Sequence, residues 1–62
     1  MNTAIRDVEL SQPVEDIDGL GDSRRCLLIF RWRGVVCGRS VVPAQDGSVE
    51  RQAVLTAAAA LG

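Results

Sequence analysis

The sequence predicts a small α+β fold, a three-stranded antiparallel sheet in the order β-β-β-α with one C-terminal Ala-rich helix packed on it. Two apolar runs flank Arg33-Gly34, an alternating segment precedes them, and an Ala-rich segment follows them. A chain of 62 residues has the length of one small domain, so we expect residues 1–62 to fold as a single unit. The hydrophobic content of 47% supplies enough apolar surface for a core and argues against disorder.

Residues 4–10 predict the first strand, because Val8 and Leu10 alternate with charged residues. Residues 11–23 follow as an acidic loop, since Pro13, two glycines and four carboxylates favour turns and solvent. The acids of this loop lack the spacing and the turn glycine of a calcium loop. We therefore expect a solvated loop here rather than a metal site.

Residues 25–42 predict a β-hairpin with Arg33-Gly34 as its two-residue turn and Gly34 at a position of positive φ. The predicted pairs are Trp32–Val35, Phe30–Cys37, Leu28–Arg39 and Cys26–Val41. Gly38, within the second strand, predicts a bulge or a close approach by another backbone.

That register divides the hairpin into two faces, because successive side chains of a strand alternate sides. The first face, the predicted core, holds Cys26, Leu28, Phe30, Trp32, Val35, Cys37 and Val41, with Arg39 as its one polar member. The second face holds Leu27, Ile29, Val36 and Val42 together with Arg31, Gly38 and Ser40. A monomer seldom leaves so many aliphatic side chains exposed together, so the second face is a docking surface unless the first strand or the acidic loop covers it. The candidate partner-binding residues are Leu27, Ile29, Arg31, Val36 and Val42.

Residues 48–61 predict the helix. Ser48 is placed to cap it and Glu50 lies in its first turn, where a negative charge is favourable. Gly62 follows where a C-cap glycine would stand. The predicted apolar stripe consists of Val54, Leu55, Ala58 and Leu61.

Charge is unevenly distributed although the whole chain carries only −1. Residues 1–23 carry −5, residues 24–45 carry +5 and residues 46–62 carry −1. We expect the acidic and basic halves to neutralise each other in the fold, with a basic face for an anionic partner as the alternative. Arg31, Trp32 and Arg33 combine cationic and aromatic groups as in single-strand binding proteins, but nucleic acid is the least favoured partner class.

Nothing in the sequence predicts an enzyme. The chain contains no His, and no pair of carboxylates can be assigned as acid and base. In the predicted register Cys26 and Cys37 lie about 13 Å apart, too far for a disulfide, so we expect two small buried hydrophobic residues. We expect no catalytic residue, no metal site and no cofactor. The acidic N-terminus and the absence of a long apolar run predict a cytoplasmic chain with no membrane contact.

Four segments carry a likeness to a known family. They are Ile5-Arg6-Asp7-Val8-Glu9-Leu10-Ser11-Gln12-Pro13-Val14, Leu27-Leu28-Ile29-Phe30-Arg31-Trp32-Arg33-Gly34, Cys37-Gly38-Arg39 and Val41-Val42-Pro43. In this order they resemble the N-terminal region of certain bacterial family 2 glycosyltransferases. The resemblance implies a position in front of a catalytic domain that binds a nucleotide-sugar through an Asp-containing, metal-binding motif. No residue of this chain matches the donor-binding, metal-binding or catalytic-base positions of that domain.

Three functions follow as expectations. The first is a non-catalytic N-terminal accessory or docking module of a glycosyltransferase-like protein, with a protein partner or an adjacent catalytic domain, or a second copy in a homodimer. The second is an independent interaction module that binds a peptide or partner through its sheet edge or exposed sheet face. The third is weak nucleic-acid binding through the Arg-rich hairpin.

Overall fold

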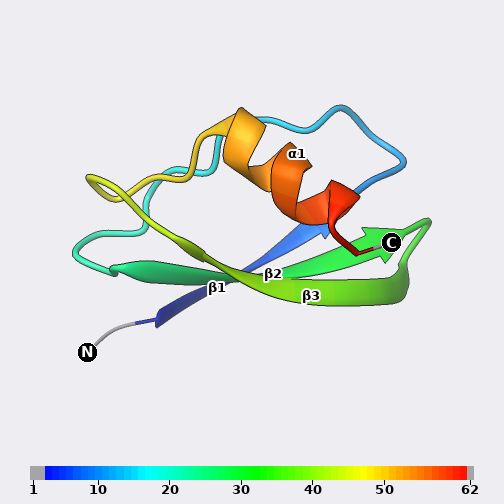
Figure 1. The fold of residues 1–62 in the computed structure, drawn as a ribbon, viewed down its shortest axis with the longest axis horizontal. Helices are drawn as coiled ribbons and strands as arrows, with labels where there is room; N and C mark the ends of the chain where they lie inside the picture. The colour runs from blue at the N-terminus through cyan, green and yellow to red at the C-terminus, as the bar shows by residue number, and fades with distance from the viewer. Residues whose placement is uncertain (1–2, 62) are drawn as a thin grey trace.

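The computed structural model describes residues 3–61 and confirms a small α+β fold (Figure 1). Its elements are β1 (Thr3–Glu9), β2 (Arg25–Trp32), β3 (Val35–Pro43) and α1 (Arg51–Ala59). The three strands form one sheet in the order β1-β2-β3, and the helix comes last, as the sequence predicts. Gly62, the predicted C-cap, lies outside the described residues.

The sheet is mixed, so the prediction of a purely antiparallel sheet is wrong. β2 and β3 are antiparallel, whereas β1 and β2 are parallel. Parallel neighbours need a crossover connection of a dozen or more residues. Residues 10–24, which include the predicted acidic loop, provide that connection. Figure 1 shows that they cross the same face of the sheet that α1 covers.

Backbone contacts join the crossover to the segment that precedes α1. Ile17 and Val49 exchange two hydrogen bonds of 2.9 and 2.8 Å, and the Leu20 N–H donates to the Gly47 carbonyl at 3.0 Å. Gly47 has a φ of +75°, and a Cβ there would lie 2.9 Å from the carbonyl oxygen of Gly21. The two connections therefore approach this closely because residue 47 has no side chain.

The hairpin has the predicted turn, but its register departs from the predicted one after two pairs, Trp32–Val35 and Arg31–Val36. Arg33 and Gly34 have φ values of +50° and +83°, typical of a primed turn, and Trp32 pairs with Val35. A register shift between Phe30 and Arg31 then inserts one extra residue into β3. The pairs beyond the shift are Phe30–Gly38, Leu28–Ser40 and Cys26–Val42, each one residue away from the prediction.

This bulge reverses the faces of β3 beyond it, because a slip of one residue turns each side chain to the other side of the sheet. Val42 is buried, whereas Val41 and Arg39 are exposed on the opposite face. The core positions predicted for Cys37 and Val41 are therefore wrong, and both residues are exposed. Those predicted for Trp32 and Val35 are also wrong, although these two residues pair as predicted on the turn side of the bulge: they are 51% and 69% exposed. Those predicted for Cys26, Leu28 and Phe30 on β2 are confirmed, with all three fully buried.

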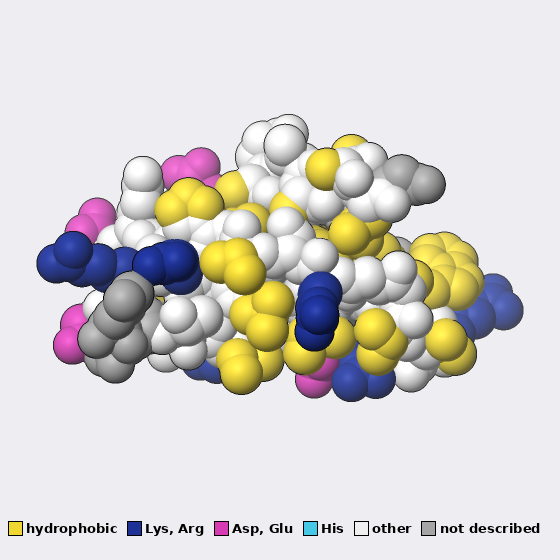
Figure 2. Space-filling model, turned by 60° about the horizontal axis from the view of Figure 1, so that its bottom comes forward, with side chains coloured by type: hydrophobic (Ala, Val, Ile, Leu, Met, Phe, Trp, Pro, Cys, Tyr) yellow, Lys and Arg dark blue, Asp and Glu magenta, His cyan; other side chains and the backbone are white. Residues whose placement is uncertain are grey.

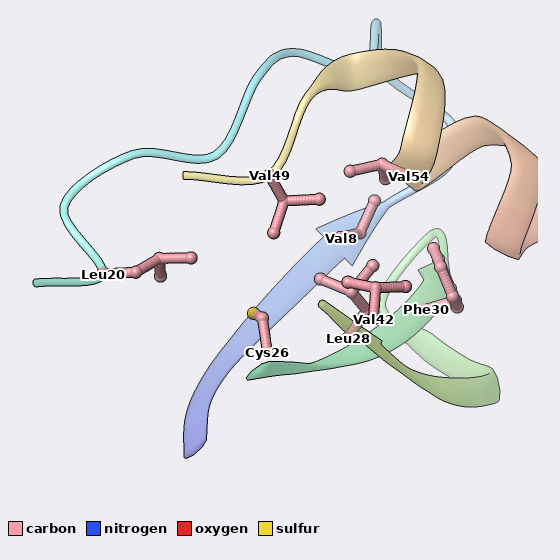
Figure 3. Packing of buried hydrophobic residues seen from close by; sticks show 8 residues of the cluster. All are labelled: Val8, Leu20, Cys26, Leu28, Phe30, Val42, Val49 and Val54. Carbon is pink, nitrogen blue, oxygen red and sulfur yellow. The ribbon is translucent and has the colours of Figure 1, made fainter. Parts of the chain in front are cut away.

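The core lies between the sheet and the layer formed by α1 and the crossover, and Figure 3 shows its side chains converging from both sides. Its buried members are Val8, Leu20, Cys26, Leu28, Phe30, Val42, Val49 and Val54. Leu20 and Val49 come from the two connections rather than from strands or helix. The connections thus supply part of the core of this short chain.

The helix begins at Arg51, three residues later than predicted, and Glu50 is its N-cap residue. Ser48 does not cap it, because the Ser48 hydroxyl donates to the Gln45 carbonyl at 3.1 Å in the preceding turn. The cap comes from the crossover instead, where Asp16 Oδ1 accepts the Arg51 N–H at 2.6 Å. The side chain of Asp16 therefore caps the N-terminus of α1, where a negative charge is favourable.

Along α1, the predicted apolar stripe faces the sheet at Val54 and becomes more exposed toward the end of the chain. Val54 is fully buried and Ala58 packs against the core, while Leu61 is 36% exposed. The Leu61 side chain lies over Gly38, where an added Cβ would come within 2.9 Å of Leu61 Cδ2. Of the two alternatives predicted at Gly38, the bulge is confirmed beside it, and the close approach is made by a side chain rather than by a backbone.

Candidate docking surface

The sheet face opposite α1 is open in the described part of the chain, since both covering segments lie on the other side (Figure 1). Strand pairing arranges its side chains in rows that cross the sheet from β1 to β3, and three of these rows lie beyond the terminal row Thr3–Arg25–Pro43. These three rows are Ile5–Leu27–Val41, Asp7–Ile29–Arg39 and Glu9–Arg31–Val36. We call these nine residues the outer face.

The apolar members of the outer face form a band across the sheet. Ile5, Val36 and Val41 are 57%, 54% and 54% exposed. Leu27 and Ile29, on the central strand, are half-buried between them. Figure 2 shows hydrophobic side chains gathered over this surface with basic side chains among them. Contiguous apolar surface of this kind marks interaction sites on soluble proteins.

Charge on the outer face is sorted by strand. The acids Asp7 and Glu9 lie on β1, and Arg39 lies on β3 at the far end of the row that begins with Asp7. On the middle strand, Arg31 Nε donates to Asp7 Oδ1 at 3.2 Å. The side chain of Arg39 makes no hydrogen bond or ion pair with any residue between 3 and 61. One side of the face is therefore acidic and the other basic.

Glu9 is bound to the hairpin turn. Its carboxylate accepts the N–H groups of Arg33 and Gly34, each at 2.8 Å, and the hydroxyl of Ser11 at 2.9 Å. The Gly34 N–H is the largest of the causes that lower the pKa of Glu9 from 4.5 to about 2. This carboxylate therefore attaches the end of β1 to the turn, and sequence reasoning missed it.

Four of the five predicted partner-binding residues share the outer face: Leu27, Ile29, Arg31 and Val36. The fifth, Val42, is only 7% exposed and faces α1, because the bulge turns it inward. Val41 takes its place on the outer face. Ile5 is a member that the sequence analysis did not single out, although its odd-numbered position in a strand that buries Val8 was a usable signal.

A second surface lies beside the outer edge of β3. A shallow groove of about 530 Å³ runs between this strand and α1. It is lined by Val42, Pro43, Glu50, Gln52, Ala53, Thr56, Ala57 and Ala60. Because the groove is lined partly by small apolar side chains and lies beside an edge strand, it is the alternative to the outer face as a surface for binding a partner.

Other chemistry was also sought among residues 3–61. No group of three His, Cys, Asp or Glu side chains there is placed to hold a metal ion. Both cysteines are free, with Cys26 buried and Cys37 exposed, so the prediction of burial is wrong for Cys37. Burial raises the pKa of the Cys26 thiol. Within the same range, no helix has the length and apolar character needed to cross a membrane.

Comparisons of the chain with known protein families, with curated proteins and with solved structures found no match.

Proposed function

We propose that this chain is a non-catalytic docking module that binds another folded protein surface through its outer face. The observation that carries the proposal is the position of Ile5, Val36 and Val41, each more than half exposed, on a sheet face that α1 and the crossover leave open. Removing such side chains from water favours a complex by about 25 cal/mol per Å² of apolar surface, before the entropic cost of association is subtracted. The flanking charges would fix the orientation of the partner.

The resemblance to family 2 glycosyltransferases supports a more specific setting for this module. In that setting the chain is an accessory part of a cytoplasmic glycosyltransferase-like protein and accompanies a sugar-transferring catalytic domain. The module would contribute assembly, and the catalytic domain would contribute the chemistry.

A second candidate is the capture of an extended peptide beside β3, which is an edge strand. The groove along α1 favours it, because small side chains such as Ala53 and Ala57 leave room for alternate side chains of an added strand. Nucleic-acid binding is less favoured than either, because Arg31 is already paired with Asp7.

Two substitutions on neighbouring positions of β2 test the outer face. Ile29→Asp places a charge at its centre, and we expect it to abolish association while the circular dichroism spectrum stays that of the folded chain. Phe30→Ala removes a fully buried ring and should cost about 3–5 kcal/mol, a large share of the stability of a small domain. Association is measured by sedimentation, for the chain alone and mixed with a family 2 glycosyltransferase catalytic domain.

The results separate the candidates. Association that survives Ile29→Asp but is lost in Ala57→Asp would replace the outer face by the groove along α1. A wild-type chain that stays monomeric both alone and in the mixture would contradict the docking proposal. Equal destabilisation by Ile29→Asp and Phe30→Ala would contradict the assignment of the two sheet faces.

A further inference from the structure

We infer that the outer face is self-complementary and that its partner is a second copy of this chain. The inference rests on the proposed function, since it requires the outer face to be the binding surface. The observation behind it is the row Asp7–Ile29–Arg39, which is acidic at one end, apolar in the middle and basic at the other end.

Two copies can bring their outer faces together about a two-fold axis that lies between them and runs parallel to β2. Such an axis places β1 of one copy over β3 of the other and leaves each β2 over its counterpart. Sheets packed face to face in this way lie about 10 Å apart with their strands nearly aligned. The contact is isologous, so each interaction occurs twice.

In the rows Ile5–Leu27–Val41 and Asp7–Ile29–Arg39, the residues that meet in this arrangement have matching chemistry. Ile29 lies against the partner's Ile29, and Ile5 lies against the partner's Val41. Asp7 faces the partner's Arg39, and Arg39 faces the partner's Asp7. Asp7 is accessible for this pair, because its side chain remains 62% exposed beside Arg31.

The alternative two-fold axis, perpendicular to β2, is disfavoured by the same charges. It would place β1 over β1 and bring Asp7 against the partner's Asp7, and likewise Arg39 against the partner's Arg39. Like charges facing each other across an interface oppose association. The charge distribution therefore selects one of the two ways in which the sheets could pair.

Arg31 does not stand at the centre of the proposed contact. Its guanidinium is turned within its own chain toward Asp7 and toward the Gly34 carbonyl, which it reaches at 3.3 Å. It lies one row beyond Ile29, toward the end of β2, where the same axis brings it opposite the partner's Arg31. This like-charge contact lies at the margin of the interface, and each guanidinium is paired with Asp7 of its own chain. Long cationic side chains commonly lie along apolar surface in this way while the charge remains in water.

The size of the face suits a weak dimer rather than a permanent one. The molecule measures 30 × 19 × 19 Å, so its long face is large enough for roughly 600 Å² of contact per partner, the scale of small, transient interfaces. We therefore expect a reversible equilibrium that shifts with protein concentration.

Charge reversal in separate chains tests the pairing. In Arg39→Asp, the acid at position 39 faces Asp7 of the partner. In Asp7→Arg, the arginine at position 7 faces the partner's Arg39. Each variant alone should therefore have a dimer dissociation constant raised about tenfold or more. In an equimolar mixture every acid faces a base again, and sedimentation should show the mixed dimer. Arg24→Asp makes the same charge change outside the outer face and should leave the wild-type equilibrium unchanged. Circular dichroism confirms the fold of each variant.

Each outcome decides the question. Association lost in both single variants and regained in the mixture supports the two-fold pairing. A mixture that stays monomeric while the wild type dimerises overturns it. A wild type that is monomeric alone, yet binds a family 2 glycosyltransferase catalytic domain through Ile29, overturns the second copy as partner and leaves the docking function standing. A dimer that withstands both Ile29→Asp and Arg39→Asp overturns both proposals.

Discussion

At the residue scale, Glu9 links two segments that are far apart in the sequence. Its carboxylate binds both N–H groups of the hairpin turn, at Arg33 and Gly34, so β1 and the turn form one hydrogen-bonded unit. Arg33 is a non-glycine residue with positive φ, an uncommon backbone conformation. A charged acceptor for its N–H offsets part of that cost.

This arrangement predicts an acid-sensitive contribution to stability. The pKa of Glu9 is lowered from 4.5 to about 2 in the folded chain, so the folded state favours the carboxylate. Its stabilising effect is therefore complete above about pH 4.5 and is lost as the pH falls toward about 2. Urea denaturation at several pH values in this range should show that the free energy of unfolding falls as the pH is lowered.

Two variants isolate the contribution of Glu9 from that of the other acids. Glu9→Gln removes the titrating group, so the free energy of unfolding of this variant should fall less steeply than that of the wild type over the same pH range. Glu15→Gln, the control, removes an exposed carboxyl of the crossover that lies away from the hairpin turn, and its profile should follow that of the wild type. A Glu9→Gln profile as steep as that of the wild type would contradict the assignment.

At the element scale, the sequence predicted the hairpin turn and, at Gly38, a bulge or a close approach, but the register predicted for the hairpin did not include the bulge. The turn depends on Arg33-Gly34, whose conformational preferences are local. Gly38, next to the inserted residue, lies beneath Leu61, a residue that the sequence separates from it by more than twenty positions. Because the register determines the faces, this one inserted residue also explains why Val42 was assigned to the docking surface and Val41 to the core.

The start of α1 likewise depends on a residue that is distant in the sequence. Ser48 is a good local candidate for a cap, yet the side chain that caps α1 is Asp16, from the crossover. Replacing a capping side chain by Ala usually costs about 0.5–2 kcal/mol. We expect Asp16→Ala to lower the free energy of unfolding by about 1 kcal/mol, measured by urea denaturation, and Asp16→Asn to retain part of the bond. Asp18→Ala, an exposed acid in the same loop, should change it little.

At the scale of the whole molecule, composition and pattern were enough for the fold class but not for the direction of β1. Alternation reveals a strand and says nothing about whether it runs parallel or antiparallel to its neighbour. The length of residues 10–24 and the apolar residues within them, Ile17 and Leu20, were the signals for a crossover that packs on the core. Which residues of β2 lie on the outer face was predictable, because the extra residue of the bulge is in β3 and leaves the alternation of β2 intact.

Self-association would also affect the thermal stability of the whole chain, because a dimer that forms only from folded chains shifts unfolding by mass action. Above the dissociation constant, each tenfold rise in concentration adds about 0.7 kcal/mol per chain, so Tm should rise by about 3 to 6 °C in a domain of this size. Ile29→Asp should have a Tm independent of concentration, since its outer face no longer pairs. Differential scanning calorimetry at several concentrations measures both. A wild-type Tm that stays constant where sedimentation shows dimer would mean that unfolded or partly unfolded chains also associate, and the proposed interface between intact outer faces would then be wrong.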